Sequence, residues 1–247
     1  MITPTKYLAN DWIDSIQQQI LRSPVTAPGK YIYSDNDFIF LGFIVEKVSG
    51  MSLHSYTSKN FYEPLGMTST GFLPLQKTTK ENIAATELDN YFRNELIHGT
   101  VHDEGASTMG GIAGHAGLFS NATDLAKLYL MLLNGGQWEG KKYFDANTVN
   151  NYTAYNSSNS RRGLGFDKPE KDNKSLKEPY PSASVSPRTF GHTGFTGTCV
   201  WVDPARELVY IFLSNRVYPT RDNGKLSSLS IRGRIQDAII ESVAGRE

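Results

Sequence analysis

The sequence has one cysteine, no net charge and no long apolar run, and each of these absences excludes a class of protein. Its 25 lysine and arginine residues balance 25 aspartate and glutamate residues, so no overall field draws in nucleic acid or an anionic membrane. The lone Cys199 cannot form an internal disulfide, and we expect it to act as a small apolar residue in a strand. No stretch reaches the ~20 apolar residues of a membrane span. We therefore predict no nucleic-acid partner and no membrane span, while the compartment stays open.

Recognisable metal-binding motifs are also absent. His98, His102 and His115, with Asp103 and Glu104, form the one group that suggests a metal. However, the four-residue spacing of the first two histidines falls on a glycine-containing loop, and the chain has neither His-Glu-x-x-His nor a cysteine pair. We expect these side chains to tie together the backbone of an irregular segment. We predict no metal and no other cofactor.

The chain has a well-marked hairpin near its end. Two apolar runs, Cys199 to Val202 and Leu208 to Leu213, flank a turn at 203–206 in which Pro204 presets φ. The second run is apolar at nearly every position, which is typical of a strand covered on both faces. We predict a central strand there, with neighbours on both sides.

Helical patterns occupy much of the remaining chain. A first helix carries Trp12 to Leu21, is capped by Asn10 or Asp11, and is ended by Pro24. A second helix covers 37–49, with Gly50 at its end. We expect this second helix to be buried, because apolar residues lie on every face, namely Phe38, Phe40, Leu41, Phe43, Ile44, Val45 and Val48.

The other elements are read from the same signals. We predict a short helix at 51–63, long loops at 68–121, a helix at 123–133 capped by Thr123 and stopped by Gly135 and Gly136, and helical turns at 145–152. Residues 156–188 are expected to be a surface excursion. A last helix, 229–243, is expected to present one apolar face to the sheet, made of Ile231, Ile235, Ala238, Ile239 and Val243.

Two polar stretches carry the candidate chemistry. Tyr33 begins a Tyr-Ser-Asp turn ahead of a helix, and such a turn is most often a cap in which Ser34 or Asp35 satisfies the first N–H groups. A tyrosine becomes a usable base near neutral pH only if cations or donors stabilise its phenolate, and His192 is a candidate partner.

The residues after His192 suggest a substrate-binding edge. Thr193 and Gly194 would line a strand that hydrogen-bonds an extended substrate, and the Phe195 N–H could face a developing oxyanion. Arg216 follows the second strand of the hairpin. It could bind a substrate carboxylate through two hydrogen bonds, although an arginine that caps a strand end is commoner.

Several motifs in order then resemble the penicillin-recognising serine hydrolases, in the branch of class C β-lactamases, related esterases and D-amino-acid peptidases. The resemblance covers almost the whole chain. It rests on Pro28-Gly-x-x-Tyr-x-Tyr-Ser-Asp, Leu41-Gly-x-Ile-Val-Glu-Lys-Val-Ser-Gly50, Pro64-Leu-Gly-Met-Thr-Ser-Thr70, Gly114-His-Ala-Gly-Leu-Phe-Ser-Asn-Ala-Thr-Asp-Leu-Ala126 and Gly191-His-Thr-Gly194.

The resemblance assigns roles to the candidate residues. Tyr33 belongs to the Tyr-x-Asn element, with Asp35 at the position of the amide, and His192-Thr193-Gly194 matches Lys-Thr-Gly. The Phe195 N–H would form half of the oxyanion hole. Both Asp35 and His192 depart from the usual residues, since one adds a carboxylate and the other titrates near pH 6.5. These departures argue against β-lactam turnover as the activity.

The nucleophile of the resembled family has no match in this sequence. That family uses the serine of Ser-x-x-Lys well before its tyrosine motif, whereas only 32 residues precede Tyr33 and no Ser-x-x-Lys occurs anywhere. We expect an N-terminally truncated chain that is inactive alone, with its first strands absent. The 208–213 strand would then pair with the missing segment or with another chain.

The resemblance implies an α+β, β-lactamase/transpeptidase-like fold in which a helical lobe sits beside an antiparallel sheet flanked by helices. We predict one domain, 1–247, with the helical lobe and loops at about 1–165 and the sheet with its last helix at about 185–247. The predicted function is acyl transfer on an ester, amide or D-amino-acid peptide bond of a small-molecule or peptide substrate. A non-catalytic module that binds peptide or cell-wall fragments is the alternative. The resemblance also implies export, usually to the periplasm.

Overall fold

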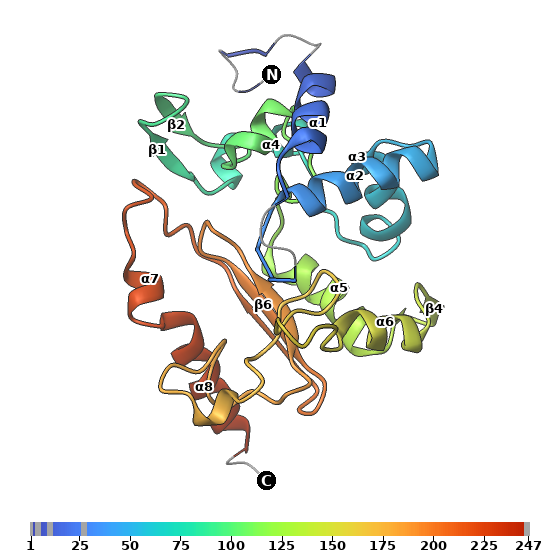
Figure 1. Ribbon diagram of the computed structural model, residues 1–247, viewed down its shortest axis with the longest axis vertical. Coiled ribbons are helices and arrows are strands. Elements are labelled where there is room, and N and C mark those ends of the chain that lie inside the picture. Colours follow the sequence, from blue (N-terminus) through green and yellow to red (C-terminus); the bar gives the residue numbers. More distant parts are fainter. Residues whose placement is uncertain (1, 3–5, 9–11, 26–28, 245–247) are drawn as a thin grey trace. The chain divides into compact units, whose positions relative to one another are not determined.

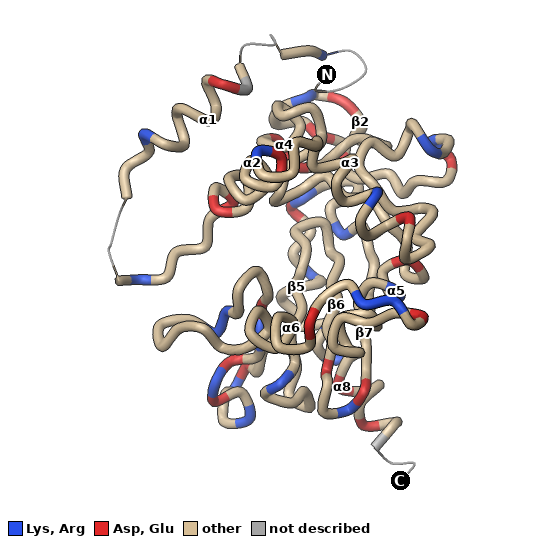
Figure 2. The backbone as a smooth tube through the Cα atoms, turned by 90° about the vertical axis from the view of Figure 1, so that its right-hand side faces the viewer, with Lys and Arg blue, Asp and Glu red and all other residues tan. Residues whose placement is uncertain are grey.

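The computed structural model describes residues 2, 6–8, 12–25 and 29–244 (Figure 1). The chain forms two compact units. Unit 1 runs to Asp124 and includes Tyr218–Thr220, while unit 2 comprises Leu125–Val217 and the chain from Arg221 onward. Acidic and basic residues are interspersed along the backbone of both units (Figure 2). The division into lobes made from the sequence stays a prediction, because a compact unit need not be a domain that folds alone.

Unit 1 begins with two helices whose ends follow local rules. α1 (Trp12–Arg22) ends before Pro24, and its expected cap at 10 or 11 lies outside the described residues. α2 (Asn36–Ser49) starts where the Ser34 hydroxyl accepts the Asn36 N–H at 3.2 Å. It ends at Gly50, which has φ 68° and donates to Glu46 O at 2.9 Å. The predicted cap and stop of this helix are therefore confirmed, with Ser34 as the capping residue.

α2 is not buried on all sides, so that prediction is wrong. Leu41, Ile44 and Val48 are 50%, 53% and 82% exposed, whereas Ile39 is 7% exposed. The buried face also contains Gly42, at which a Cβ atom would lie 3.3 Å from the Gly114 nitrogen. An apolar residue on every face of a helix does not show which face packs.

The rest of unit 1 is short elements joined by loops. α3 (Leu53–Thr57) continues into a π-helical turn at Ser58–Tyr62, which matches the predicted helix at 51–63. The expected loops at 68–121 contain more structure than predicted. They hold 3-10 turns at Pro74–Gln76 and Lys80–Asn82, an antiparallel hairpin of β1 (Glu87–Asp89) and β2 (Glu95–Ile97), and α4 (Glu104–Thr108).

The missed hairpin is built on polar contacts, which explains its weak apolar pattern. The carboxylate of Asp89 accepts the N–H groups of Tyr91, Phe92 and Arg93 at 2.8, 2.9 and 3.0 Å. Arg93 is 1% exposed and donates to the carbonyls of residues 101 and 102 at 3.2 and 2.6 Å. Backbone groups and one buried cation, rather than alternating apolar residues, hold this turn together.

The helix α5 (Ala122–Leu133) crosses the boundary between the units. Its cap is the Asn121 side chain, which accepts the Asp124 N–H at 2.9 Å, so the prediction of Thr123 is wrong by two residues. It ends as predicted at Gly135 and Gly136, with φ values of 64° and 92°. A small hairpin of β3 (Gln137–Trp138) and β4 (Lys141–Lys142) leads to α6 (Ala146–Thr153), near the predicted helical turns.

The main sheet of unit 2 is antiparallel with the order β5-β6-β7. It consists of β5 (Phe190–Thr193), β6 (Cys199–Asp203) and β7 (Leu208–Phe212), and the predicted hairpin and its turn are confirmed. Trp201 pairs with Tyr210 across the hairpin, and both pack in a core with buried Cys199 and with Ile239. This confirms the apolar role of Cys199, and burial raises the pKa of its thiol to about 11.

β7 pairs only with β6 within the described part of the chain, so the two neighbours expected from its apolar run are not present. The open edge expected for a chain without its first strands is present. Four of its five residues are only half-buried, while every residue of β6 is buried. The apolar run correctly predicted a strand, but it could not supply a second neighbour.

The prediction that residues 156–188 form a surface excursion is wrong in part, because 156–159 and 174–178 are exposed but other positions are buried. Asp167, Lys168 and Ser182 are at most 2% exposed, and Val185 is 3% exposed. The backbone of Asp167 pairs with Gly191 in both directions, at 2.7 and 3.0 Å, so the segment lies along the edge of β5 away from β6. A polar composition suggested a surface, but these polar groups bond to one another.

Two helices complete unit 2, α7 (Lys225–Ser228) and α8 (Ile231–Ala244). α8 matches the predicted last helix, but only part of its predicted face packs. Ile239 joins the Trp201 core, whereas Ile235 is 37% and Val243 52% exposed and Ala238 is also exposed. The buried line runs through Gly233, Gln236 and Ile240. No helix in the described part of the chain is long and apolar enough to cross a membrane.

Candidate functional site

The Tyr33-Ser34-Asp35 turn stands at the start of α2 in unit 1. Tyr33 is 56% exposed, and Ser34 caps the helix, so the common structural role of such a turn is present. The exposed Asp35 makes no capping bond with its side chain. Instead, one ligand atom from each of Asp35, Asp103 and His115 lies within 4.8 Å of the other two. The fold therefore joins the tyrosine motif to the Gly114-His115 motif.

Asp103 and His115 are hydrogen-bonded to each other within that cluster. His115 Nε2 donates to Asp103 Oδ1 at 2.8 Å, and the Asp103 carboxylate also accepts the Ala106 N–H at 2.7 Å. Burial favours the neutral acid, but these two hydrogen bonds outweigh it and hold the pKa of Asp103 below its ordinary value. Two carboxylates and an imidazole are residue types that could hold a divalent cation.

The other histidines of the suspected metal group have separate structural partners. His98 Nε2 lies 2.6 Å from the Ile83 carbonyl, and His102 Nε2 lies 2.6 Å from Glu87 Oε2. Asp103 caps α4. These contacts agree with the expected role of tying an irregular segment together.

The His192 imidazole lies at the end of β5 in unit 2, and its hydrogen bonds define its tautomer. Arg162 Nη1 lies 2.7 Å from His192 Nε2, and a guanidinium can only donate, so Nε2 accepts. His192 Nδ1 lies 2.8 Å from the Thr193 carbonyl, which can only accept, so Nδ1 carries the proton. Burial, together with the positive Arg162, lowers the pKa of His192. The ring is neutral in this arrangement.

A buried carboxylate organises the groups around His192. Asp167 accepts two hydrogen bonds from Arg161, at 2.7 and 3.1 Å, and one from the Tyr180 hydroxyl at 2.8 Å. Arg162 Nε lies 3.3 Å from the same carboxylate. Burial alone would raise the pKa of Asp167, but the hydrogen bonds from Arg161 and Tyr180 hold it below its ordinary value.

The chain turns after Thr193 to enter β6. Gly194 and Gly197 close this turn, with the Gly197 N–H donating to Gly194 O at 3.1 Å. Phe195 is 61% exposed at its tip. Arg216 lies over the Phe195 ring at 4.5 Å and donates to the Phe195 carbonyl at 2.9 Å. It also donates to the carbonyls of residues 221 and 223. Arg216 thus braces the turn, while substrate binding by it stays a prediction.

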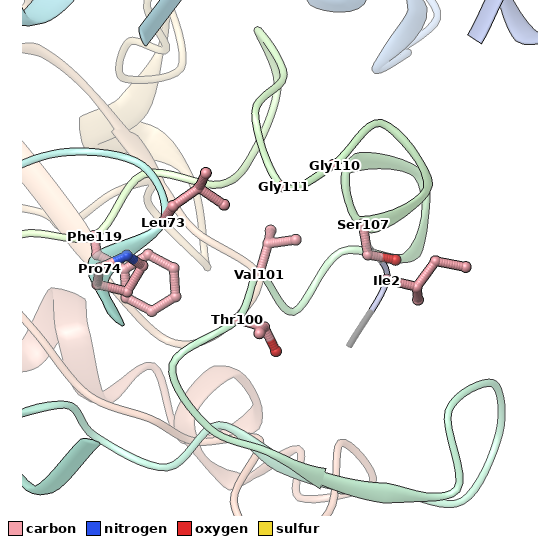
Figure 3. Close-up of a pocket in the computed structure, with 9 residues that line it drawn as sticks. All are labelled: Ile2, Leu73, Pro74, Thr100, Val101, Ser107, Gly110, Gly111 and Phe119. Atoms are coloured by element: carbon pink, nitrogen blue, oxygen red, sulfur yellow. The ribbon is translucent and has the colours of Figure 1, made fainter. Parts of the chain in front are cut away.

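A small hollow in unit 1 is lined by residues from the N-terminal part of the chain (Figure 3). Its lining is mostly apolar, with hydroxyls from Thr100 and Ser107, and the Ser107 hydroxyl already donates to Glu104 O at 2.7 Å. None of the seven residues predicted to form the site lines it. The hollow therefore does not support the predicted substrate-binding site.

Comparison with known proteins identifies the family. The family model described as "Beta-lactamase" matches residues 3–229. The chain belongs to the beta-lactamase family. The order of motifs that suggested a penicillin-recognising serine hydrolase is thereby confirmed at the level of the family.

Curated relatives of this chain are considerably longer than it is. A protein of Escherichia coli K12 named "Putative D-alanyl-D-alanine carboxypeptidase" is 40% identical over 233 residues, which cover 88% of this chain and 53% of that protein. The chain thus spans about half the length of the curated relatives it matches.

Solved structures agree on the beta-lactamase-like fold. The hydrolase EstCE1, described as having promiscuous acyltransferase activity, superposes with a TM-score of 0.60 at 17% identity, covering 93% of this chain and 63% of that one. The octameric penicillin-binding protein homologue of Pyrococcus abyssi gives 0.57 at 20%, covering 87% and 46%. At such identities the likeness concerns the fold alone. It supports the predicted mix of helices and antiparallel strands.

Sequence reasoning missed the residues that surround His192 in this member of the beta-lactamase family. Arg162, Asp167 and Tyr180 all come from the segment interpreted as a surface excursion. One sequence feature could have indicated them, namely the two adjacent arginines Arg161 and Arg162 with the acidic Asp167 a few residues later. Opposite charges so close in a chain often form a pair, but their partner on β5 is set by the fold.

Proposed function

We propose that this chain is part of a serine hydrolase that transfers an acyl group from an ester, amide or D-amino-acid peptide bond. Tyr33 is the proposed proton shuttle and His192 its proposed electrostatic partner. Thr193, Gly194 and the Phe195 N–H form the proposed edge that binds substrate, with Asp35 and Arg216 as further proposed substrate-binding residues. The observation that carries the proposal is the ordered set of family motifs within the 3–229 match. The name of the E. coli relative makes a terminal D-alanyl-D-alanine bond the first substrate to test.

The nucleophile is proposed to come from outside this sequence. No Ser-x-x-Lys occurs in the 247 residues, and the relatives extend well beyond the matched region. Without a serine whose proton can be taken by a neighbouring base, acyl transfer cannot begin. We accordingly propose that this chain turns over no substrate alone. From the family resemblance, we also propose that the complete protein is exported, usually to the periplasm.

Covalent labelling tests the enzyme proposal. We expect neither a fluorescent penicillin nor a fluorophosphonate to label the 247-residue chain. A longer gene product that carries Ser-x-x-Lys ahead of these residues should label and should release D-alanine from a D-alanyl-D-alanine peptide. Tyr33→Phe in that product should lower the rate about 100-fold or more, the scale of proton-transfer catalysis. A folded longer product that takes up neither probe and releases no D-alanine would overturn the proposal.

A non-catalytic binding module is the second candidate, favoured by the missing Ser-x-x-Lys. Such a module would bind cell-wall peptides without consuming them. Saturable binding of a D-alanyl-D-alanine peptide by both the short and the longer product, with no release of D-alanine by either, would support it.

The open edge of β7 is a proposed pairing surface for a further strand. Among the described residues it pairs with β6 alone, and an edge strand exposes backbone groups that another strand can satisfy. Hydrogen exchange of the β7 amides should be slower in the longer product than in the 247-residue chain. Equal exchange in both would contradict the pairing.

A further inference from the structure

The contact from Arg162 bears on the role that the sequence suggested for His192, which stays a prediction. A cationic imidazole could stabilise a phenolate, but the hydrogen bond from Arg162 Nη1, at 2.7 Å, needs the lone pair of Nε2. The proton on Nδ1 is directed to the Thr193 carbonyl at 2.8 Å. The permanent positive charge at this end of β5 therefore belongs to the guanidinium.

We propose that Arg162 is a positioning residue of the site, which fixes His192 as the neutral Nδ1–H tautomer and supplies the positive charge beside it. This inference rests on the proposed function for its catalytic meaning, though not for its geometry. It gives the acyl-transfer site a charge that does not titrate between pH 5 and 9, because a guanidinium stays protonated throughout that range.

Asp167 holds Arg162 in place. The carboxylate is 0% exposed, and Arg162 Nε approaches Oδ1 at 3.3 Å while the Arg162 side chain is 20% exposed. The paired backbones of Asp167 and Gly191 fix this carboxylate next to the strand that carries His192. A long, flexible arginine side chain is thus held between a buried carboxylate and the imidazole, which reduces the rotamer entropy lost when substrate binds.

Comparison with the neighbouring Arg161 distinguishes a purely structural role of this cluster from a role in positioning His192. Arg161 makes the two-bonded contact with Asp167, donates to Glu170 at 2.7 Å and lies 4.2 Å above the Tyr180 ring. These contacts are those of a structural arginine. Arg162 alone of the pair donates to His192. The two adjacent arginines therefore form a matched pair of variants that share Asp167 and differ at the imidazole.

The ring nitrogens of His192 can be observed directly in the 247-residue chain by long-range ¹H–¹⁵N correlation between pH 5 and 8. His192→Gln identifies the signals by their loss. In the unsubstituted protein we expect a protonated Nδ1, an unprotonated Nε2 and titration below the ordinary pH of 6.5. The charged groups that act on the ring include Arg162, Arg161 and Asp167. The pKa of Asp167 is held below its ordinary value and that of Arg161 above it, so both stay ionised through this range. A protonated Nε2 at pH 7 would overturn the proposal without any variant.

The titration midpoint of His192 in arginine variants is the second measurement. Arg162→Gln should raise the titration midpoint of His192 toward its ordinary value, because a repulsive charge and a donor to Nε2 are lost together. Arg162→Lys should restore most of the shift, since it keeps the charge. Arg161→Gln should leave the Nδ1–H tautomer in place. An unchanged midpoint in a folded Arg162→Gln protein, or equal effects of the two glutamine variants, would show that the cluster is only structural.

These measurements need no turnover, so they remain decisive even if the hydrolase proposal fails. In an active longer product, Arg162→Gln should lower kcat/KM by about tenfold or more, on the scale of a lost electrostatic donor. Loss of the tautomer with full activity would instead show that the hydrolase does not depend on Arg162.

Discussion

At the scale of single residues, the charges buried in unit 2 differ in how well they are compensated. Asp167 accepts hydrogen bonds from the Arg161 guanidinium and the Tyr180 hydroxyl. Lys168 is 2% exposed, and its amine has only neutral neighbours in these contacts, the Thr189 carbonyl at 3.0 Å and the Tyr155 ring at 4.6 Å. Burial, with a smaller contribution from nearby Arg188, lowers the pKa of Lys168 from 10.5 to about 8 despite the attraction of Asp203. The charged amine therefore opposes folding at neutral pH.

Lys168→Met should stabilise the protein at pH 7. The unfolded chain binds the lysine proton more tightly than the folded chain, so the cost is fully present below pH 8 and disappears as pH rises toward 10.5. We expect the free energy of unfolding to rise by about 1–3 kcal/mol at pH 7, after allowing for the lost bond to Thr189, and the gain to shrink by pH 10. Urea unfolding at both pH values measures this. The exposed Lys177→Met is the control, and a gain that does not depend on pH would contradict the explanation.

At the scale of elements, two glycines set how closely α2 packs against the Gly114-His115 motif. A Cβ atom at Gly114 would lie 1.9 Å from the Phe38 carbonyl oxygen, far inside any contact distance. Close approach at Gly42 and Gly114 therefore fixes the start of α2 relative to His115, and with it the position of Asp35.

Gly114→Ala should destabilise unit 1 by about 1–3 kcal/mol or more, because the backbone of α2 has to move to admit the methyl group. The urea midpoint of unfolding, followed by circular dichroism, measures the loss. Gly224→Ala is the matched control, since a Cβ atom there has no neighbour within 4 Å and its φ of −87° suits alanine. If both variants unfold at the same midpoint, the close packing of α2 is not as described.

At the scale of the whole molecule, equal numbers of opposite charges conceal an unequal response to acid. Asp89, Asp103, Asp167 and Asp203 occur in both units, and hydrogen bonds hold the pKa of each carboxyl below its ordinary 3.8 in spite of burial. Each therefore stabilises the folded state above pH 3.8 and loses that contribution as pH falls further. His192, whose pKa is lowered from 6.5, begins to oppose folding at a higher pH, once the solution falls below 6.5.

The free energy of unfolding should accordingly fall in two stages on acidification. A shallow decline below pH 6.5 is due to His192, and a steep decline below about pH 4 is due to the carboxylates. His192→Gln should remove the first stage. Asp167→Asn should cost about 3–5 kcal/mol at pH 7 and make the second stage shallower, because it leaves buried arginines without their carboxylate. Urea titrations from pH 7 to 3 measure both, with the exposed Asp172→Asn as control. A single stage in the unsubstituted protein would contradict the assignment.

Local steric and hydrogen-bonding rules let the sequence by itself determine where many elements begin and end. Gly50 and Gly135 stop helices because a residue without Cβ adopts positive φ readily, and the 203–206 turn follows from Pro204. The order of motifs was enough to indicate the family. The site residues Tyr33 and His192 were likewise chosen from sequence, and their catalytic roles stay predictions.

Only the tertiary structure decided which faces pack and which charges meet. The exposed side of α2 and the burial of Asp167, Lys168 and Ser182 depend on contacts between distant segments. The bond from Arg162 to His192 joins residues 30 positions apart. The physical reason is that local propensity acts over a few residues, whereas the burial and pairing of a charge depend on what the folded chain brings beside it.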